Sequence, residues 1–388
     1  MNSSLPTLLC VVGARPNFMK IAPICSKLAN YSGSLRVLLV HTGQHYDAAM
    51  KDAFFEQLGI PKPDVDLGVG SGTHAVQTAH IMLGFEPVLD EAKPRAVLVV
   101  GDVNSTIACG LVAVKKNIPL IHVEAGLRSY DRQMPEEINR ILTDQISDLL
   151  LTSERNARDN LLHEGIADDK IHFVGNVMID SLLSHLSSAV EPDETIRRHL
   201  PELVKRIQPK GYVLLTLHRP SNVDNPQVLA KLLDAVSAIS NNIPVVFPIH
   251  PRTRKMVEKA GLQDRLRGPG ILLVPPVGYL EMLGLMNSAQ LVMTDSGGVQ
   301  EETTALGIPC VTLRENTERP ITVEQGTNTV VGSDTQMILS TVENILATGG
   351  KGGKIPELWD GNAAGRIVDI IRDRYFGASH YLSQRLPG

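Results

Sequence analysis

Short apolar segments alternate with longer stretches of helical character along the chain, and this alternation limits the possible folds more than any other feature. The apolar segments of the first half are TLLCVVG, LRVLLVHTG, AVLVVGD, LIHVEAG and DLLLTS. The pattern then restarts with GYVLLTLHR, PVVFPIH, ILLVPP, LVMTDSGG and PCVTLRE. Short buried strands separated by helices predict parallel sheets with helices on both faces. The sequence therefore predicts an α/β protein with two doubly wound, Rossmann-like domains that face each other across a cleft.

Length and one polar segment predict where the domains divide. A chain of 388 residues with 43% hydrophobic content can form two cores. The proline- and charge-rich segment AVEPDETIRRHLPELVKRIQPKG suits a connection between them. We expect an amino-terminal domain over residues 1–190 and a carboxyl-terminal domain over residues 191–388. The last amphipathic stretch, AAGRIVDIIRDRY, can pack back on the first domain.

Charge and cysteine content exclude several classes of protein. The net charge is −5 with acids and bases interspersed, so no basic surface for nucleic acid or anionic lipid is indicated. The four cysteines form no C-x-x-C pair, which argues against a zinc site or a disulfide framework. The first apolar run is too short for a signal sequence or a membrane span. We therefore expect a cytoplasmic protein with reduced cysteines and without nucleic-acid or membrane partners.

Candidate site residues follow the apolar segments directly. In open α/β sheets, ligands bind beyond the carboxyl ends of the strands, so these positions are the ones that predict a site. The residues found there are Arg15, Asp102, Glu124, His218, His250 and Asp295. With two such halves facing each other, the site is expected in the cleft between the domains.

The segment TDSGGVQEE reads as a strand end, a tight turn and the start of a helix. Ser296, Gly297 and Gly298 would then lie at the helix N-terminus, where unpaired N–H groups and the helix dipole bind phosphate. Glu302 falls about one turn further in, where its carboxylate can accept hydrogen bonds from ribose hydroxyls. The alternative is a plain turn, in which Glu301 and Glu302 only complement the helix dipole.

Arg15 and Lys20, in GARPNFMK, follow the first strand. An arginine fork and a lysine point charge suit a diphosphate, although a solvated surface pair is equally consistent with these residues alone. No G-x-G-x-x-G motif follows this strand, so a nicotinamide dinucleotide is not favoured.

Three acidic residues stand out in the first half: Asp102, Glu124 and Glu136. The first two end strands, where a charge is costly unless it is paired or functional. Glu136 follows Pro135, a good first helical residue, so its alternative role is to stabilise a helix N-terminus.

Two histidines, His218 and His250, each follow a strand of the second half and lie close to an arginine. An imidazole there can bind phosphate or transfer protons, or it can simply be satisfied by backbone groups. Metal binding is disfavoured, because neither H-E-x-x-H nor another compact ligand spacing occurs.

Taken together, these motifs carry a resemblance to a known family. They are GARPNFMK, TGQHYD, GDVNST, HVEAGLRS, MPEEINRILTDQISD, TLHR, HPRTR, TDSGGVQEE, ENTERP and GTN, in this order from residue 13 to about residue 328. The chain resembles the non-hydrolysing UDP-N-acetylglucosamine 2-epimerases. The resemblance implies a glycosyltransferase-B type fold, a UDP-sugar substrate held mainly by the carboxyl-terminal domain, a homodimer and no organic cofactor.

The resemblance also implies roles for individual residues. The residues that resemble the UDP-binding group are Arg15, His250, Ser296, Gly297, Gly298 and Glu302, the last at the ribose. Those that resemble the catalytic group are Lys20, Asp102, Glu124, Glu136 and His218, and Arg319 resembles a residue of the substrate pocket.

Two departures from the family pattern limit this transfer. Met282 stands where family members often place an aromatic residue under the uracil, so a thioether contact would replace stacking. Gln44 and His45 are present, but the later segment GSGTHAVQTA lacks the arginine with which some members bind an activating second substrate. The sequence therefore does not predict this regulation.

The implied activity is inversion at C2 of UDP-N-acetylglucosamine through loss and re-addition of UDP. Several alternatives share parts of the pattern. TGQHYDAAM, FFEQLGIPKPD and PVGYLEM also resemble the branch that acts on UDP-2,3-diacetamido-2,3-dideoxyglucuronic acid, whereas ENTERPIT favours the N-acetylglucosamine enzymes. A hydrolysing epimerase, a UDP-sugar glycosyltransferase and a non-catalytic nucleotide-binding module are the remaining alternatives.

Overall fold

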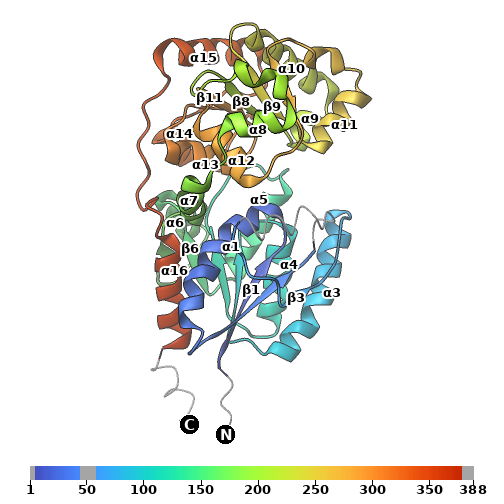
Figure 1. Cartoon of the computed structure of the whole chain (residues 1–388). Coiled ribbons are helices and arrows are strands. Elements are labelled where there is room, and N and C mark those ends of the chain that lie inside the picture. The colour runs from blue at the N-terminus through green and yellow to red at the C-terminus, as the bar shows by residue number, and fades with distance from the viewer. Residues whose placement is uncertain (1–4, 44–57, 378–388) are drawn as a thin grey trace, which may run out of the picture. The chain divides into compact units, whose positions relative to one another are not determined.

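The apolar segments become the strands of two parallel sheets in the computed structural model, which describes residues 5–43 and 58–377 and only the backbone of Arg15 and Pro16. The chain divides into two units, Met1–Ser181 with Glu357–Gly388, and Leu182–Pro356. Each unit has one parallel sheet with helices around it (Figure 1). The prediction of two doubly wound α/β domains is confirmed.

The first unit contains a seven-stranded sheet in the order β3-β2-β1-β4-β5-β6-β7. Its strands are β1 Thr7–Val12, β2 Arg36–His41, β3 Val65–Asp66, β4 Ala96–Val100, β5 Leu120–Val123, β6 Leu149–Thr152 and β7 Ile171–Phe173. Its helices are α1 Arg15–Leu28, α3 His74–Ala92, α4 Asn104–Lys115, α5 Pro135–Ile146, α6 Arg155–His163, α7 Val177–His185, in which the unit boundary falls, and α16 Ala363–Ile371. Every residue of β1, β4, β5 and β6 is buried, because helices cover both faces of the sheet.

The second unit contains a six-stranded sheet in the order β10-β9-β8-β11-β12-β13. Its strands are β8 Val213–Thr216, β9 Val245–Pro248, β10 Ile271–Val274, β11 Leu291–Thr294, β12 Cys310–Thr312 and β13 Asn328–Val330. Its helices are α8 Pro192–His199, α9 Pro220–Val223, α10 Pro226–Ser240, α11 Pro251–Lys259, α12 Tyr279–Asn287, α13 Gly297–Leu306, α14 Pro320–Glu324 and α15 Thr335–Thr348. A continuous apolar core joins α10, α15 and the sheet.

The chain returns to the first unit near its end, where α16 packs against α1 (Figure 1). Two contacts fix this return: the Trp359 indole N–H donates to the Ser153 carbonyl at 3.2 Å, and Asp180 accepts the N–H groups of Ala363 and Ala364 at 3.1 and 2.7 Å. The Asp180 carboxylate thus caps the start of α16, where backbone donors lack partners within the helix.

Some elements lacked a signal in the sequence. The short strands β3, β7 and β13 lie at sheet edges and hold two or three residues each, so they carry no apolar run. The polar segment after residue 189 was expected to be a connection, but it contains α8, in which Thr195 and Ile196 are fully buried. The two buried side chains explain why this segment forms a helix although most of its residues are polar.

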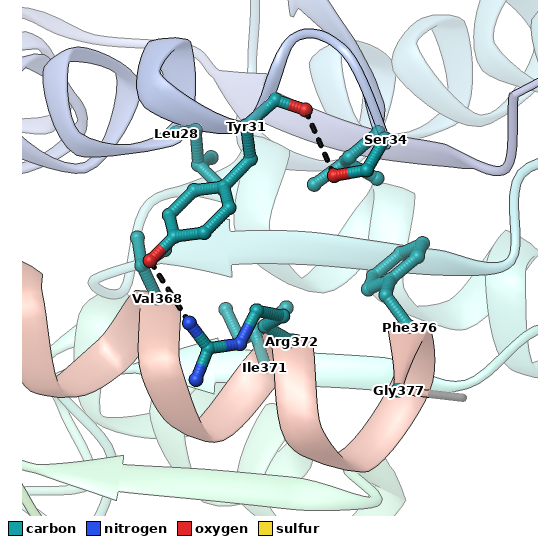
Figure 2. A pocket seen from close by; sticks show the side chains of 9 residues that line it. Leu28, Tyr31, Ser34, Val368, Ile371, Arg372, Phe376 and Gly377 are labelled. Carbon is teal, nitrogen blue, oxygen red and sulfur yellow. Dashed lines mark hydrogen bonds between the residues drawn. The ribbon is translucent and has the colours of Figure 1, made fainter. Parts of the chain in front are cut away.

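A cavity of about 130 Å³ lies where the end of α1 meets the π-helical turn Arg372–Phe376 (Figure 2). Tyr31 and Arg372 meet at its edge, where the guanidinium donates to the phenol oxygen at 3.0 Å. The candidate site residues predicted from the sequence do not line it. This cavity is therefore separate from the predicted site residues.

All four cysteines are unpaired and buried, as the sequence predicts. Burial raises the pKa of each thiol, to about 12 for Cys25 and Cys310, so at neutral pH they are packing residues rather than nucleophiles. Within the part of the chain that the structure describes, no helix is long and apolar enough to cross a membrane.

Candidate active site

The first unit brings together Lys20 and Glu124 at the switch point of its sheet, between β1 and β4. The Lys20 ammonium donates to Glu124 Oε1 at 2.6 Å, and both side chains are buried. Gly101, which follows β4, makes room for this pair, because a Cβ there would lie 2.9 Å from Lys20 Nζ. A buried ion pair at a switch point is the arrangement expected of a functional carboxylate.

The backbone of Glu124 is itself unusual. Its φ angle is 70°, in the left-handed region that few residues other than glycine adopt. Its N–H and that of Ala125 both donate to the Leu151 carbonyl, at 3.0 and 3.1 Å, which holds the turn in place. Conformations of this kind cost about 1–3 kcal/mol and concentrate at functional sites.

Asp102 is held by two side chains of helix α5. Arg140 Nη2 donates to Asp102 Oδ2 at 2.5 Å, and Arg140 Nη1 donates to Glu137 Oε2. The amide of Asn139 donates to the Asp102 backbone carbonyl at 2.9 Å. Consecutive side chains of α5 therefore fix both the backbone and the carboxylate of Asp102.

The two glutamates that follow Pro135 have different environments. Glu137 is buried and accepts hydrogen bonds from the Ser129 N–H, the Ser129 hydroxyl and the Tyr130 N–H. Glu136 is half-buried in the first turn of α5. Glu137 is thus committed to structure, whereas Glu136 remains a candidate for chemistry.

The second unit has its own charged pair at the corresponding switch point, between β8 and β11. His218 Nδ1 lies 3.0 Å from Asp295 Oδ1, and Asp295 also accepts the N–H groups of His218 and Arg219 and the amide of Asn222. Burial raises the pKa of the Asp295 carboxyl, but His218 and these backbone donors outweigh it and hold the pKa below its usual range. Asp295 therefore orients the imidazole of His218 as an ionised partner.

His250 follows β9 and caps helix α11. Its Nδ1 accepts the N–H of Arg252 at 3.2 Å, so the proton of the neutral ring lies on Nε2. The rings of His218 and His250 are 5.9 Å apart between centroids. The structure thus brings together two of the histidines that the sequence singled out.

The start of α13 matches the sequence prediction. Ser296 is the N-cap residue, and Gly297 begins the helix. A Cβ at Gly297 would lie 2.6 Å from Glu318 Oε1, so glycine allows this side chain to approach the helix terminus. Glu302 is buried in the second turn and accepts a hydrogen bond from the Tyr279 hydroxyl at 3.1 Å. Tyr279 therefore fixes the carboxylate expected at a ribose.

Three arginines gather near the start of α13. Arg314 lies 2.8 Å and Arg219 lies 3.6 Å from Glu318, while Arg319 pairs with Glu301 at 2.9 Å. Burial alone would raise the pKa of the Glu318 carboxyl, but the arginines lower it far below its usual range. The cluster holds three cations against two anions beside a helix N-terminus, which suits an anionic ligand.

The structure does not place the remaining positions named in the sequence analysis within these clusters of contacts. The Arg15 side chain, Gln44 and His45 lie outside the described residues. Met282 is half-buried on α12. Among the residues that the structure describes, no group of three or more His, Cys, Asp or Glu side chains has the arrangement of a metal site.

Several site residues were not identified from the sequence, namely Tyr279, Arg140, Arg314, Glu318, His122 and Asp144. Two weak signals existed. Arg140 lies one helical turn from Glu136 and Glu137, and His122 lies on β5 two residues before Glu124, which follows the strand. Arg314 and Glu318 are only four positions apart, but this pair was not identified from the sequence. The contacts of Tyr279 with Glu302 and of His122 with Asp144 join residues distant in the sequence, so no local pattern could reveal them.

Comparison with known proteins identifies the family. The model of the UDP-N-acetylglucosamine 2-epimerase family matches residues 27–372. The chain belongs to this family. A UDP-N-acetylglucosamine 2-epimerase of Methanococcus maripaludis is 43% identical over 93% of this chain and 97% of its own length. A UDP-2,3-diacetamido-2,3-dideoxy-D-glucuronate 2-epimerase of Pseudomonas aeruginosa is 44% identical over 87% of this chain and 92% of its own length.

A solved 2-epimerase also shares the fold. The UDP-N-acetylglucosamine 2-epimerase of Methanocaldococcus jannaschii, crystallised with UDP-N-acetylglucosamine and UDP, superposes with a TM-score of 0.85 at 41% identity. The match covers 95% of this chain and 99% of that chain. The glycosyltransferase-B type fold and the 2-epimerase family predicted from the sequence are both confirmed.

Proposed function

We propose that this protein interconverts UDP-N-acetylglucosamine and UDP-N-acetylmannosamine by inverting C2 of the sugar, without an organic cofactor. The observation that carries the proposal is the 43% identity to a relative named for this activity, over 93% of the chain. The paired charges at both switch points support it, because a diphosphate and a sugar both need polar groups beyond the strand ends.

The chemistry at C2 explains why several acids are required. C2 bears a hydrogen and an acetamido group but has no adjacent carbonyl, so direct deprotonation would give an unstabilised carbanion. If UDP leaves C1 first, the developing oxocarbenium ion acidifies the C2 hydrogen, and a carboxylate can remove it. The product is a 2-acetamidoglucal. Protonation from the other face and re-addition of UDP then give the epimer.

The second unit is proposed to bind UDP. Its cations and helix N-terminus stabilise the charge that develops on the leaving diphosphate. The residues assigned to this task are His250, Ser296, Gly297, Gly298 and Arg319, together with Arg15 of the first unit and with Glu302 at the ribose. Tyr279 supports the assignment of Glu302, because its hydroxyl holds the carboxylate at 3.1 Å.

The acids of the first unit are proposed to act on C2. Asp102, Glu124 and Glu136 are the proton donors and acceptors, and Lys20 donates to Glu124 at 2.6 Å. Arg140 donates to Asp102 in the same way. His218, oriented by Asp295, is the catalytic residue contributed by the second unit.

One incubation tests the proposed activity. The purified protein is mixed with UDP-N-acetylglucosamine alone, and the products are followed by NMR. UDP-N-acetylmannosamine should appear and reach the same equilibrium ratio from either epimer. Free N-acetylmannosamine as the main product would indicate a hydrolysing enzyme, and an unchanged substrate would contradict the proposal.

A second substrate is favoured by a specific observation. The Pseudomonas relative named for the diacetamido-glucuronate is as similar to this chain as the N-acetylglucosamine enzyme is, at 44% against 43% identity. Parallel assays with both UDP-sugars decide between them. The larger kcat/KM identifies the substrate, since both sugars undergo the same inversion at C2.

Replacing Glu302 by alanine should weaken UDP binding by about 10-fold or more, because a hydrogen bond to a charged group contributes about 1.5–3 kcal/mol. Isothermal calorimetry with UDP measures the effect. Glu343→Ala, an exposed change on α15, is the matched control and should bind UDP normally. An unchanged affinity in Glu302→Ala would remove Glu302 from the ribose.

We also propose that the protein is a cytoplasmic homodimer. Exposed apolar side chains on α3 and α5 support association, namely Val76, Leu83, Ile138 and Leu142. Both helices pack against α4 in the first unit. The unpaired buried cysteines suit a reducing compartment. Sedimentation at twice the 42.1 kDa chain mass would support the dimer, and a monomer at micromolar concentration would contradict it.

A further inference from the structure

A second buried pair, His122 with Asp144, lies in the first unit among residues to which the proposed mechanism gives no role. His122 is on β5 and Asp144 is on α5, and His122 Nδ1 lies 2.7 Å from Asp144 Oδ1. Both side chains are completely buried. On its other side, His122 Nε2 lies 2.8 Å from the Gly101 carbonyl oxygen. The imidazole therefore connects a helix to the loop after β4.

The partners of this ring fix its orientation and one of its protons. A carbonyl oxygen only accepts hydrogen bonds, so Nε2 must donate to Gly101. Asp144 Oδ2 accepts the Gly126 N–H at 3.1 Å and lies 2.8 Å from Arg128 Nη2, so both oxygens of this carboxylate have partners. The ring of His122 is therefore held from both sides, by the side chain of Asp144 and by the backbone of Gly101.

This pair connects the segments that carry the three candidate acids. Gly101, with a φ of 66°, directly precedes Asp102. Gly126, with a φ of 79°, ends the turn that contains Glu124. Asp144 lies on the helix whose first turn contains Glu136. One carboxylate and one imidazole therefore hold the backbones from which all three acids project.

We propose that the His122–Asp144 pair is a positioning pair for the epimerisation, which sets the relative placement of the acids on the β4 loop, the β5 turn and helix α5. The proposal rests on the proposed function of this site. Removal of a proton from one face of C2 and delivery to the other requires carboxylates fixed relative to one another. Hydrogen bonds behind reactive groups commonly change activity by about 10–100-fold, because they fix orientation.

A purely structural pair would behave differently from a positioning pair. Loss of a structural contact lowers the folded fraction, but each folded molecule keeps its turnover and its product distribution. Loss of a positioning contact lowers kcat per folded molecule. It also raises the share of glycal and free UDP released per turnover, since reprotonation falls behind elimination. UDP affinity should stay unchanged, because its proposed ligands lie mainly in the other unit.

Asp144→Asn in the full chain tests the proposal, since asparagine keeps the shape of the side chain and replaces its carboxyl group by an amide. We expect kcat per folded molecule to fall about 10–100-fold, with an unchanged UDP dissociation constant and more released glycal. Asp180→Asn is the matched control, because Asp180 is also a buried carboxylate of the first unit that accepts two backbone N–H groups. It should lower the melting temperature and leave kcat per folded molecule unchanged.

Nitrogen-15 NMR of histidine-labelled wild-type protein gives a second test that needs no active variant. The His122 signals, identified by their loss in His122→Asn, should show a proton on Nε2, which donates to the Gly101 carbonyl. A His122 ring without a proton on Nε2, or wild-type kcat and product partition in Asp144→Asn, would overturn the positioning proposal. If instead the wild-type protein fails to epimerise either UDP-sugar, the proposed function fails while the ring geometry still stands.

Discussion

Glu124→Gln should lower turnover by about 10² or more while leaving UDP affinity within twofold of the wild type. The carboxylate lies 2.6 Å from Lys20 in a buried site, so the amide removes both the base and the partner of a buried cation. The ligands proposed for UDP lie mainly in the second unit, which this change does not touch. Steady-state kinetics by NMR and calorimetry with UDP measure the two quantities separately.

The control for this variant is Glu91→Gln, an exposed change on α3 of the same unit. It should retain wild-type turnover. Asp102→Asn and Glu136→Gln are expected to behave like Glu124→Gln, since each would remove a proton donor or acceptor at the sugar. Near-normal turnover in Glu136→Gln would assign that residue to stabilising the N-terminus of α5 instead.

Glu318→Gln should lower the free energy of unfolding of the second unit by about 3–5 kcal/mol, the usual cost of removing one partner of a buried ion pair. Its carboxylate lies 2.8 Å from Arg314 and 3.6 Å from Arg219, and the Glu318 side chain is only 4% exposed. Without it, the positive charges of Arg314 and Arg219 repel each other. Thermal unfolding should show a fall of about 10 °C in melting temperature, whereas the exposed Glu343→Gln should show none.

The lowered pKa of the Glu318 carboxyl predicts that the stability of the second unit depends on pH. The arginines hold the folded-state pKa of Glu318 below its unfolded value of about 4.3. The folded state therefore binds fewer protons at this position, and the stabilisation is fully present above the unfolded pKa. It is lost as the pH falls from there toward the folded value. Glu318→Gln should reduce this acid-sensitive part of the wild-type profile, and an identical pH profile in the variant would contradict this role.

The central part of the fold could be predicted from the sequence because its signal is local. Buried parallel strands such as β1 and β4 read as unbroken apolar runs, and the turn at Ser296 marks the start of a helix. The edge strands β3 and β13 could not be predicted, because they hold only two or three residues and depend on pairing with a neighbour.

The same distinction between local and distant signals applies to the residues of the candidate site. Residues at strand ends, such as Asp102 and His218, could be predicted because their position follows from the strand itself. Which residues pair with them could not be predicted, since Arg140 contacts Asp102 across 38 positions, and Asp295, itself a candidate at a strand end, contacts His218 across 77. The sequence also could not separate Glu136 from Glu137, which differ only in what the fold places around them.

The route of epimerisation is tested most directly by the fate of the hydrogen at C2. Without a carbonyl beside C2 to stabilise a carbanion, this hydrogen leaves as a proton when UDP departs, and the proton that replaces it comes from an acid that exchanges with solvent. We expect UDP-N-acetylmannosamine formed in heavy water to carry deuterium at C2, as measured by NMR and mass spectrometry. Product that retains the original C2 hydrogen would contradict elimination and re-addition of UDP and would require transfer of hydride to a bound redox cofactor.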